Sequence, residues 1–209
     1  YAGVYQHLGR PDESDRWARR LIQFGESTGH LLAIAVGHEY LAENANICGW
    51  FERAAEEARL DGQIGERLGS LDRVAWSKFG LAWALGGLGQ LEQAEQTARE
   101  GLELCDRIGE GRLAVWLESS LVGLLADRGL FEEARGRLPD LLARGDGFRQ
   151  VALQTITRSA AAYLALRQAD PASALQPLEE ALALIEPTKS ENARLFVGGQ
   201  LAEAFLKLD

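Results

Sequence analysis

The chain has 209 residues, of which 46% are hydrophobic and 25% are charged, and its formal net charge is -9. These proportions are typical of a folded soluble protein. The acidic balance argues against a nucleic-acid partner, because proteins that bind the phosphate backbone need a basic surface. No apolar run approaches the roughly 18 residues of a membrane-spanning helix, so we expect no membrane segment.

Small and apolar residues recur along the chain at a spacing of 40. One column of the repeat is Gly9, Gly49, Gly89, Gly129 and Ala169, and a second is Gly29, Gly69 and Gly109. A small residue follows five positions after each member of the first column, at Ser14, Ala54, Ala94, Ala134 and Ala174. An apolar or aromatic residue stands eight positions before each member of the first column, at Tyr1, Leu41, Leu81, Leu121 and Ala161. Leu201 occupies the same position in a sixth unit. The periodicity predicts one repeat array over residues 1–209.

Each unit contains two helical patterns and no strand period. In the stretch before Gly89, the apolar stripe is Leu71, Val74, Ala75, Ala82 and Leu85. In the stretch before Gly109, it is Ala94, Ala98, Leu102, Cys105 and Ile108, with charged residues mostly opposite. These are amphipathic helices. The first glycine column then lies in the turn within a helix pair and the second in the turn between pairs, where a left-handed residue commonly ends a helix.

Some units depart from this pattern. Asp61 and Gly62 stand where other units have Leu21-Ile22, Leu141-Leu142 and Ala181-Leu182. Pro139 and Pro177 lie inside predicted second helices, where we expect bending or fraying because proline removes a backbone donor. Asp170-Pro171 signals a helix start, since it pairs a cap residue with proline in the first turn.

These residues resemble the tetratricopeptide repeat (TPR) family. The matching positions are Leu81-Ala82 with Leu85 and then Ala94 with Ala98, Tyr1-Ala2 with Tyr5 and then Ser14 with Ala18, and Leu201-Ala202 with Phe205. The period of 40 exceeds the family's usual length of about 34. His38, Lys78, Glu118 and Arg158 stand where the family often has tryptophan. Long-period arrays of this kind look like those of bacterial multidomain signalling proteins, including sensor regions of transcription activators and adenylate cyclases.

The resemblance implies an all-α solenoid of stacked antiparallel helix pairs, forming a right-handed superhelix whose first helices line a concave groove. We expect the groove residues to be Tyr40, Trp76, Phe79, Trp83, Trp116, Tyr163 and Phe196. In this interpretation Trp76 and Trp116 lie on neighbouring helices, and Gly80 and Gly87 leave notches between the indoles. The alternative is that these glycines allow close helix packing and that the tryptophans belong to the core. Asp127 and Arg167 occupy neighbouring groove positions and could form a salt bridge.

The sequence carries no recognisable catalytic motif. His7, His30 and His38 lack metal-ligand spacing, and we identify no nucleotide loop, nucleophile elbow or cofactor fingerprint. We therefore expect a non-enzymatic interaction scaffold, without metal or cofactor, that binds a peptide, a partner protein or other domains of its parent chain. A domain that senses a small-molecule effector is the alternative.

Two further expectations concern the origin of the chain. Cys48 and Cys105 are its only cysteines, which favours a reducing cytoplasm over a disulfide framework. The chain has no methionine and opens and stops within the repeat pattern, so we interpret it as a fragment of a longer protein.

Overall fold

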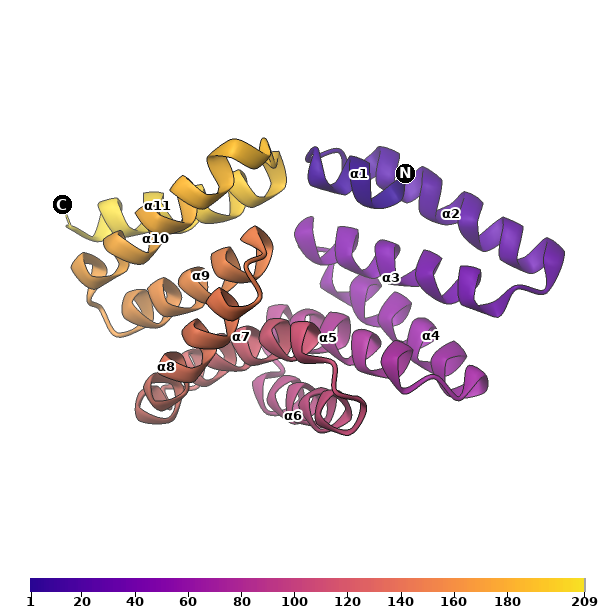
Figure 1. Ribbon diagram of the computed structural model, residues 1–209, viewed down its shortest axis with the longest axis horizontal. Helices are drawn as coiled ribbons and strands as arrows, with labels where there is room; N and C mark the ends of the chain where they lie inside the picture. The colour runs from indigo at the N-terminus through magenta and orange to yellow at the C-terminus, as the bar shows by residue number, and fades with distance from the viewer. Residues whose placement is uncertain (209) are drawn as a thin grey trace. The chain divides into compact units, whose positions relative to one another are not determined.

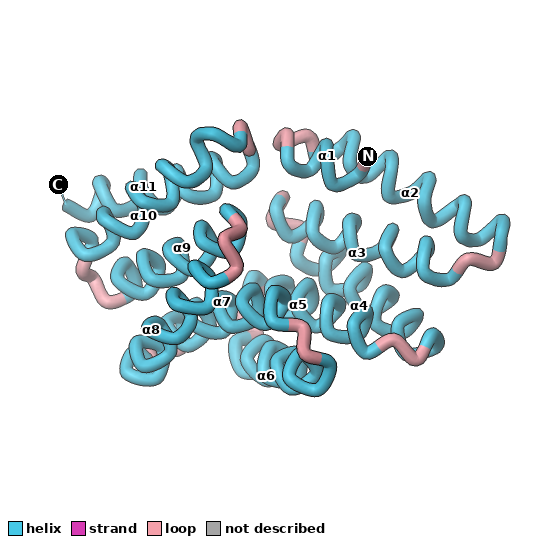
Figure 2. The backbone as a smooth tube through the Cα atoms, viewed as in Figure 1, coloured by secondary structure: helices cyan, strands magenta, loops and turns pink. Residues whose placement is uncertain are grey.

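The computed structural model describes residues 1–208 and is built from α-helices throughout that range (Figures 1 and 2). The helices are α1 (Ala2–His7), α2 (Pro11–Thr28), α3 (Leu31–Ile47), α4 (Phe51–Leu68), α5 (Leu71–Gly87), α6 (Leu91–Ile108), α7 (Gly111–Asp127), α8 (Phe131–Gly147), α9 (Val151–Arg167), α10 (Pro171–Ile185) and α11 (Glu191–Leu208), with a short 3-10 turn at Glu186–Thr188. None of the described helices is long and apolar enough to cross a membrane.

The helices pack as two compact units, Tyr1–Ala114 and Val115–Asp209, whose boundary falls in the first turn of α7. In the first unit each helix from α1 to α6 packs on the next, and the first helices of successive pairs also meet, α1 with α3 and α3 with α5. In the second unit α8 to α11 pack in the same order, and α9 meets α11. Within each unit, then, consecutive helices stack as antiparallel pairs, and the first helices form a layer of their own. The all-α solenoid class is confirmed, while a single array over residues 1–209 stays a prediction.

The turns follow the predicted spacing. A left-handed residue stands every 20 positions: Gly9, Gly29, Gly49, Gly69, Gly89, Gly109, Gly129, Arg149, Ala169 and Lys189. Both predicted glycine columns therefore lie where a helix ends and the chain turns back. The second column continues beyond Gly109 through Arg149 and Lys189, which the sequence pattern did not reveal because neither residue is small.

The core of each unit is built around small residues on the second helices. Ser14, Ala54, Ala94, Ala134 and Ala174, the column predicted from the repeat, are each 0% exposed. Because an alanine side chain occupies little space, the paired helices approach closely there, and larger residues such as Leu41, Leu141 and Leu178 fill the interior on either side.

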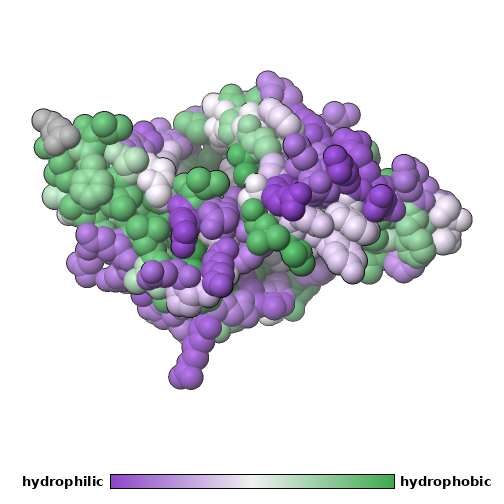
Figure 3. Space-filling model, turned by 90° about the horizontal axis from the view of Figure 1, so that it is seen from above, coloured by the Kyte–Doolittle hydropathy of each residue, from purple (hydrophilic) through white to green (hydrophobic). Residues whose placement is uncertain are grey.

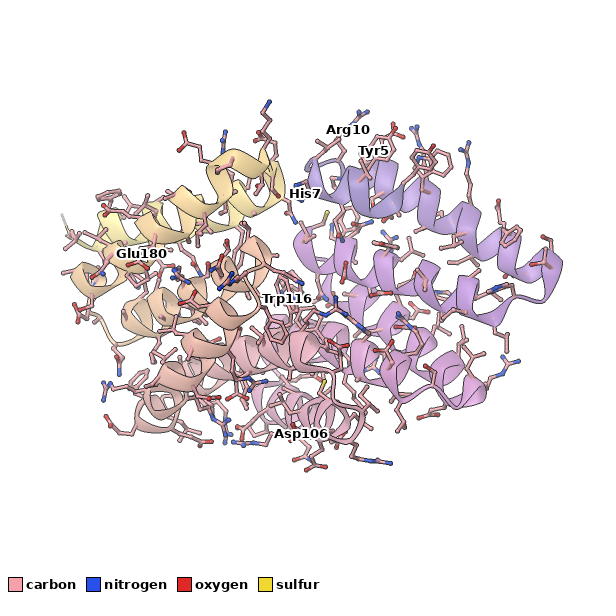
Figure 4. All side chains as sticks on the ribbon, in the orientation of Figure 1. Tyr5, His7, Arg10, Asp106, Trp116 and Glu180 are labelled. Atoms are coloured by element: carbon pink, nitrogen blue, oxygen red, sulfur yellow. The ribbon has the colours of Figure 1, made fainter. Side chains whose placement is uncertain are left out.

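Four polar contacts, three of them ion pairs, lie where TPR motifs often carry tryptophan. His38 contacts Glu57 at 2.7 Å, Lys78 contacts Glu100 at 2.6 Å, Glu118 contacts Arg137 at 2.7 Å and Arg158 contacts Glu180 at 3.0 Å. Each pair joins the first helix of a repeat to its second helix; Glu180, on α10, is labelled in Figure 4. The same position on the first helix is thus occupied in four successive repeats by a polar side chain that contacts the second helix. In the third of these repeats the acid, Glu118, is on the first helix and the base, Arg137, is on the second.

The two internal prolines do not interrupt their helices. The α8 helix continues past Pro139 to Gly147, and α10 continues past Pro177 to Ile185. The expected fraying is therefore wrong, since the loss of one backbone donor is tolerated within a helix that packs on its neighbours. Asp170 caps α10 as predicted, its side chain accepting a hydrogen bond from the backbone N–H of Ser173 at 3.2 Å.

Candidate functional site

In the first unit the predicted groove aromatics come from α3 and α5. Tyr40, Trp76 and Trp83 are all partly exposed, whereas Phe79 is only 7% exposed. The Phe79 ring lies 6.2 Å from each tryptophan ring, edge-on to Trp76 and tilted against Trp83. Phe79 is therefore an interior support for the two indoles rather than an exposed groove residue, and the expectation is corrected for this position.

Of the two glycines of α5 predicted to form notches between the indoles, Gly87 does not form one. A side chain at Gly87 would overlap the ring of Phe51, which projects from α4 into that space. At Gly80, the nearest neighbours of an added carbon are Ala58 at 3.6 Å and Ala42 at 3.9 Å. Close packing of α5 on α4 is thus the reason for Gly87, which corrects the notch prediction at that position. At Gly80 the distances are those of ordinary contacts, so a notch there stays a prediction.

A cluster of charged residues lies beside Trp76. Arg73 of α5 contacts Asp61 of α4 at 2.8 Å and Glu39 of α3 at 2.9 Å. Glu43, one turn after Glu39, accepts a hydrogen bond from the Gln6 side chain of α1 at 2.9 Å. Three helices thus bring three carboxyl groups near one guanidinium group, and α1 adds the amide of Gln6. The Asp61 side chain is only 2% exposed, and its Oδ1 has no hydrogen-bond partner within the protein.

Burial controls the ionisation of these acids. It raises the pKa of Glu43 to about 7, with a further rise from the negative charge of Glu39. Burial also raises the pKa of Asp61 to about 7, although the adjacent Arg73 acts in the opposite direction. The pKa of Tyr40 is raised as well, by burial and then by the charges of Glu39 and Glu43. Acids whose pKa values are shifted towards neutrality by burial are characteristic of functional sites.

The charged pair of Asp61 and Arg73 is particular to the second and third helix pairs. At intervals of 40 residues the same two positions are apolar or small: Leu21 and Ala33, Gly101 and Leu113, Leu141 and Leu153, and Ala181 and Ala193. The fold is therefore built elsewhere in this chain without any charge at these positions. The sequence pattern marks Asp61 as an irregularity. Its pairing with Arg73 could have been suspected from the sequence, because Arg73 also differs from the apolar residues at the equivalent positions of the other repeats.

A small cavity of about 10 Å³ opens at this cluster. Its lining includes Glu39, Glu43, Asp61, Trp76 and Phe79. All three of its ionisable groups are acids, whereas Arg73 does not line it. A volume of this size accommodates about one water-sized group. It is far below the 300–1,000 Å³ of typical small-molecule sites.

In the second unit, the predicted groove positions of α7, α9 and α11 carry a chain of polar contacts. The Tyr163 hydroxyl donates a hydrogen bond to Asp127 at 2.8 Å, and the Arg167 guanidinium lies 4.6 Å from the centre of the Tyr163 ring. Arg167 contacts both Asp127 and Glu203 at 3.5 Å. The predicted pairing of Asp127 with Arg167 is confirmed. Tyr163 is held in place by these contacts and remains partly exposed.

The remaining predicted groove residues are Trp116 and Phe196. Trp116, labelled in Figure 4, is partly exposed on α7, and Phe196 on α11 is 44% exposed. The predicted proximity of Trp76 and Trp116 joins residues of different units and stays a prediction. Figure 3 shows apolar side chains gathered near the C-terminal end, where α11 exposes Phe205 and Leu206.

Another hollow lies in the second unit, between α10 and α11. It has a volume of about 370 Å³ and is lined by Leu182, Ala183, Ile185, Glu186 and Arg194. None of the predicted aromatics contributes to it. Across residues 1–208, no group of three or more His, Cys, Asp or Glu side chains is arranged to hold a metal ion.

The fold is shared with solved structures of helical-repeat proteins. The chain superposes with a TM-score of 0.68 on a Rap protein complexed with Competence and Sporulation Factor, at 15% identity and over 99% of its own length. It spans 62% of that protein. It also superposes on BtubC from P. vanneervenii, with a TM-score of 0.62, 17% identity and coverage of 99% of this chain and 88% of the other. These are likenesses of fold. No protein-family model and no curated protein sequence matches the chain.

Proposed function

We propose that this chain is a non-catalytic scaffold that binds a peptide, or an extended segment of a partner protein, on the first-helix face of its repeats. The observation that carries the proposal is the set of partly exposed aromatics on α3 and α5, Tyr40, Trp76 and Trp83. Trp76 also lines a small cavity together with Glu39, Glu43 and Asp61. Aromatic side chains dominate binding hot spots because they bury a large area while few rotatable bonds become fixed.

The likeness to the Rap protein supports the proposal, because that protein was solved in complex with Competence and Sporulation Factor. The alternative, a sensor of a small effector bound between the aromatics, receives less support, since the cavity at Trp76 measures only about 10 Å³ and the hollow of about 370 Å³ in the second unit is lined by none of the predicted aromatics. We further propose that the parent chain is a bacterial signalling protein of the cytoplasm, whose other domains are among the candidate partners.

The test is the replacement of Trp83 by alanine. Binding is measured by fluorescence polarisation with a labelled pool of randomised octapeptides, each acetylated at its N-terminus and amidated at its C-terminus. We expect the dissociation constant to rise at least tenfold, because truncation of a hot-spot aromatic costs about 2 kcal/mol or more. The far-UV circular dichroism spectrum and the melting temperature should stay close to those of the parent.

The matched control is Trp50→Ala. Trp50 is 51% exposed in the turn between α3 and α4, where it contacts Arg53 rather than the first-helix face. We expect this variant to bind the pool as the parent does. A Trp83 variant that binds normally would contradict the proposed face. One that melts far below the parent would show that Trp83 is a core residue.

A further inference from the structure

The acid cluster of the first unit consists of Glu39, Glu43 and Asp61, and Arg73 forms ion pairs with only two of them. Arg73 uses its two terminal nitrogens on Asp61 and Glu39. Glu43 is left with the uncharged amide of Gln6. The charged groups that act on Glu43 are Glu39 on its own helix, Asp61 on α4 and Arg73 on α5, so two of the three are acids. A buried carboxylate without a cation is costly, which makes the cluster receptive to a cation from outside.

A second observation concerns Asp61 and the cavity beside the cluster. The Oδ1 atom of Asp61 is buried and has no hydrogen-bond partner, and Asp61 lines the cavity together with Glu39 and Glu43. An unsatisfied buried acceptor costs free energy that an incoming donor recovers. Three of the residues that line the cavity are thus acids, and one of them, Asp61, has a carboxyl oxygen without a hydrogen-bond partner.

The size of the cavity favours a lysine ammonium group over an arginine guanidinium group. A volume of about 10 Å³ accepts a water-sized group. A lysine ammonium is a compact charge with three donors, whereas an arginine guanidinium is a wide planar fork. Three donors match the three acids. Trp76 borders the same cavity, and an indole ring attracts a neighbouring cation and packs against an alkyl chain.

We propose that the partner segment carries a lysine whose ammonium group binds between Glu39, Glu43 and Asp61, with its alkyl chain against Trp76. This assignment rests on the proposed function and names the chemistry of its partner. A role in folding alone does not account for the cluster, because the repeats with Leu141 and Leu153 at the positions of Asp61 and Arg73 form the same helix pairs without charge.

The experiment uses the full chain and divides the octapeptide pool by one fixed position. Four labelled sub-pools carry lysine, acetyl-lysine, norleucine or arginine at that position, and each position is scanned. On the parent protein we expect one position at which the lysine sub-pool binds at least tenfold more tightly than the other three. On the variant carrying both Glu39→Gln and Glu43→Gln, the preference for lysine should fall to less than threefold.

The control variant is Glu103→Gln, which removes an exposed carboxylate from α6 and should keep the full preference. Equal binding of the lysine and norleucine sub-pools at every position would overturn the lysine site and leave the peptide scaffold standing. An equal preference for arginine would overturn the ammonium assignment. Absence of binding by every sub-pool would overturn both the lysine site and the peptide scaffold. The comparison of lysine with acetyl-lysine needs no variant, so it decides the matter even if the double variant does not fold.

Discussion

Replacement of Glu43 by glutamine should make the protein more stable at neutral and alkaline pH. Glu43 is a partly buried acid whose pKa is raised from 4.5 to about 7, chiefly by burial. The folded protein therefore holds the Glu43 proton more tightly than the unfolded chain does. As the pH rises from 4.5 towards 7, the unfolded state releases this proton first, so stability falls through that window and is level above it. Glutamine keeps the acceptor for Gln6 and has no charge to bury.

The size of the effect follows from the shift in pKa. A rise from 4.5 to about 7, at about 1.4 kcal/mol per unit, corresponds to about 3 kcal/mol at pH 8. Part of the Glu43 side chain contacts solvent, which screens the charge and reduces this to about 1–2 kcal/mol. At pH 4.5 the gain should shrink to a few tenths of a kcal/mol, because the parent carboxyl is then largely neutral in the folded state.

The assay is urea unfolding of the parent and the variant at pH 4.5 and pH 8, followed by far-UV circular dichroism and tryptophan fluorescence. Glu103→Gln, on the exposed face of α6, is the control and should change the free energy of unfolding by less than about 0.5 kcal/mol at either pH. An equal change for Glu43→Gln at both pH values, or a loss of stability at pH 8, would refute the reasoning.

Three further predictions concern the buried ion pair, the glycines of α5 and a left-handed turn residue. Arg73→Leu should destabilise the protein by about 3–5 kcal/mol in thermal unfolding, since it leaves buried carboxylates without their cation, and adding Asp61→Leu should recover most of that loss. Gly87→Ala should lower the free energy of unfolding by about 1–2 kcal/mol, because the new methyl group meets the ring of Phe51. Gly80→Ala should raise it by up to about 1 kcal/mol, because the methyl group has room and alanine favours a helix. The reverse order of stabilities would contradict the packing described for α5. Ala169→Gly should raise the free energy of unfolding by about 1 kcal/mol, because Ala169 has a φ of 57°, and no change would show that the turn is unstrained.

Much of the fold could be predicted because the sequence pattern of one helix pair recurs several times along the chain. The small residues at Ala54, Ala94 and Ala134 share one structural position, and their recurrence marks the helix pair more reliably than any single copy does. Turn geometry was readable where glycine occupies the left-handed position, as at Gly89. It was not readable at Arg149 or Lys189, where a long side chain adopts the same conformation.

The candidate site was predicted less completely. Tyr40, Trp76 and Trp83 are partly exposed as the groove interpretation requires, but the same periodicity placed Phe79 with them although it is buried. Aromatic residues on one helix have similar hydrophobicity whether they face solvent or the interior. Which of them is covered depends on the neighbouring helices, and the sequence of one helix does not contain that information.

The sequence by itself determined the helices, their pairing and the positions of the turns, because these depend on local periodicity and backbone preference. Only the tertiary structure decided what the irregular residues do. Asp61 and Arg73 are 12 positions apart on two helices, and Glu39 and Gln6 come from two more. Their meeting beside Trp76 depends on packing across three repeats. The pKa values depend in turn on the burial that this packing creates, because the cost of a charge is set by the solvent it loses.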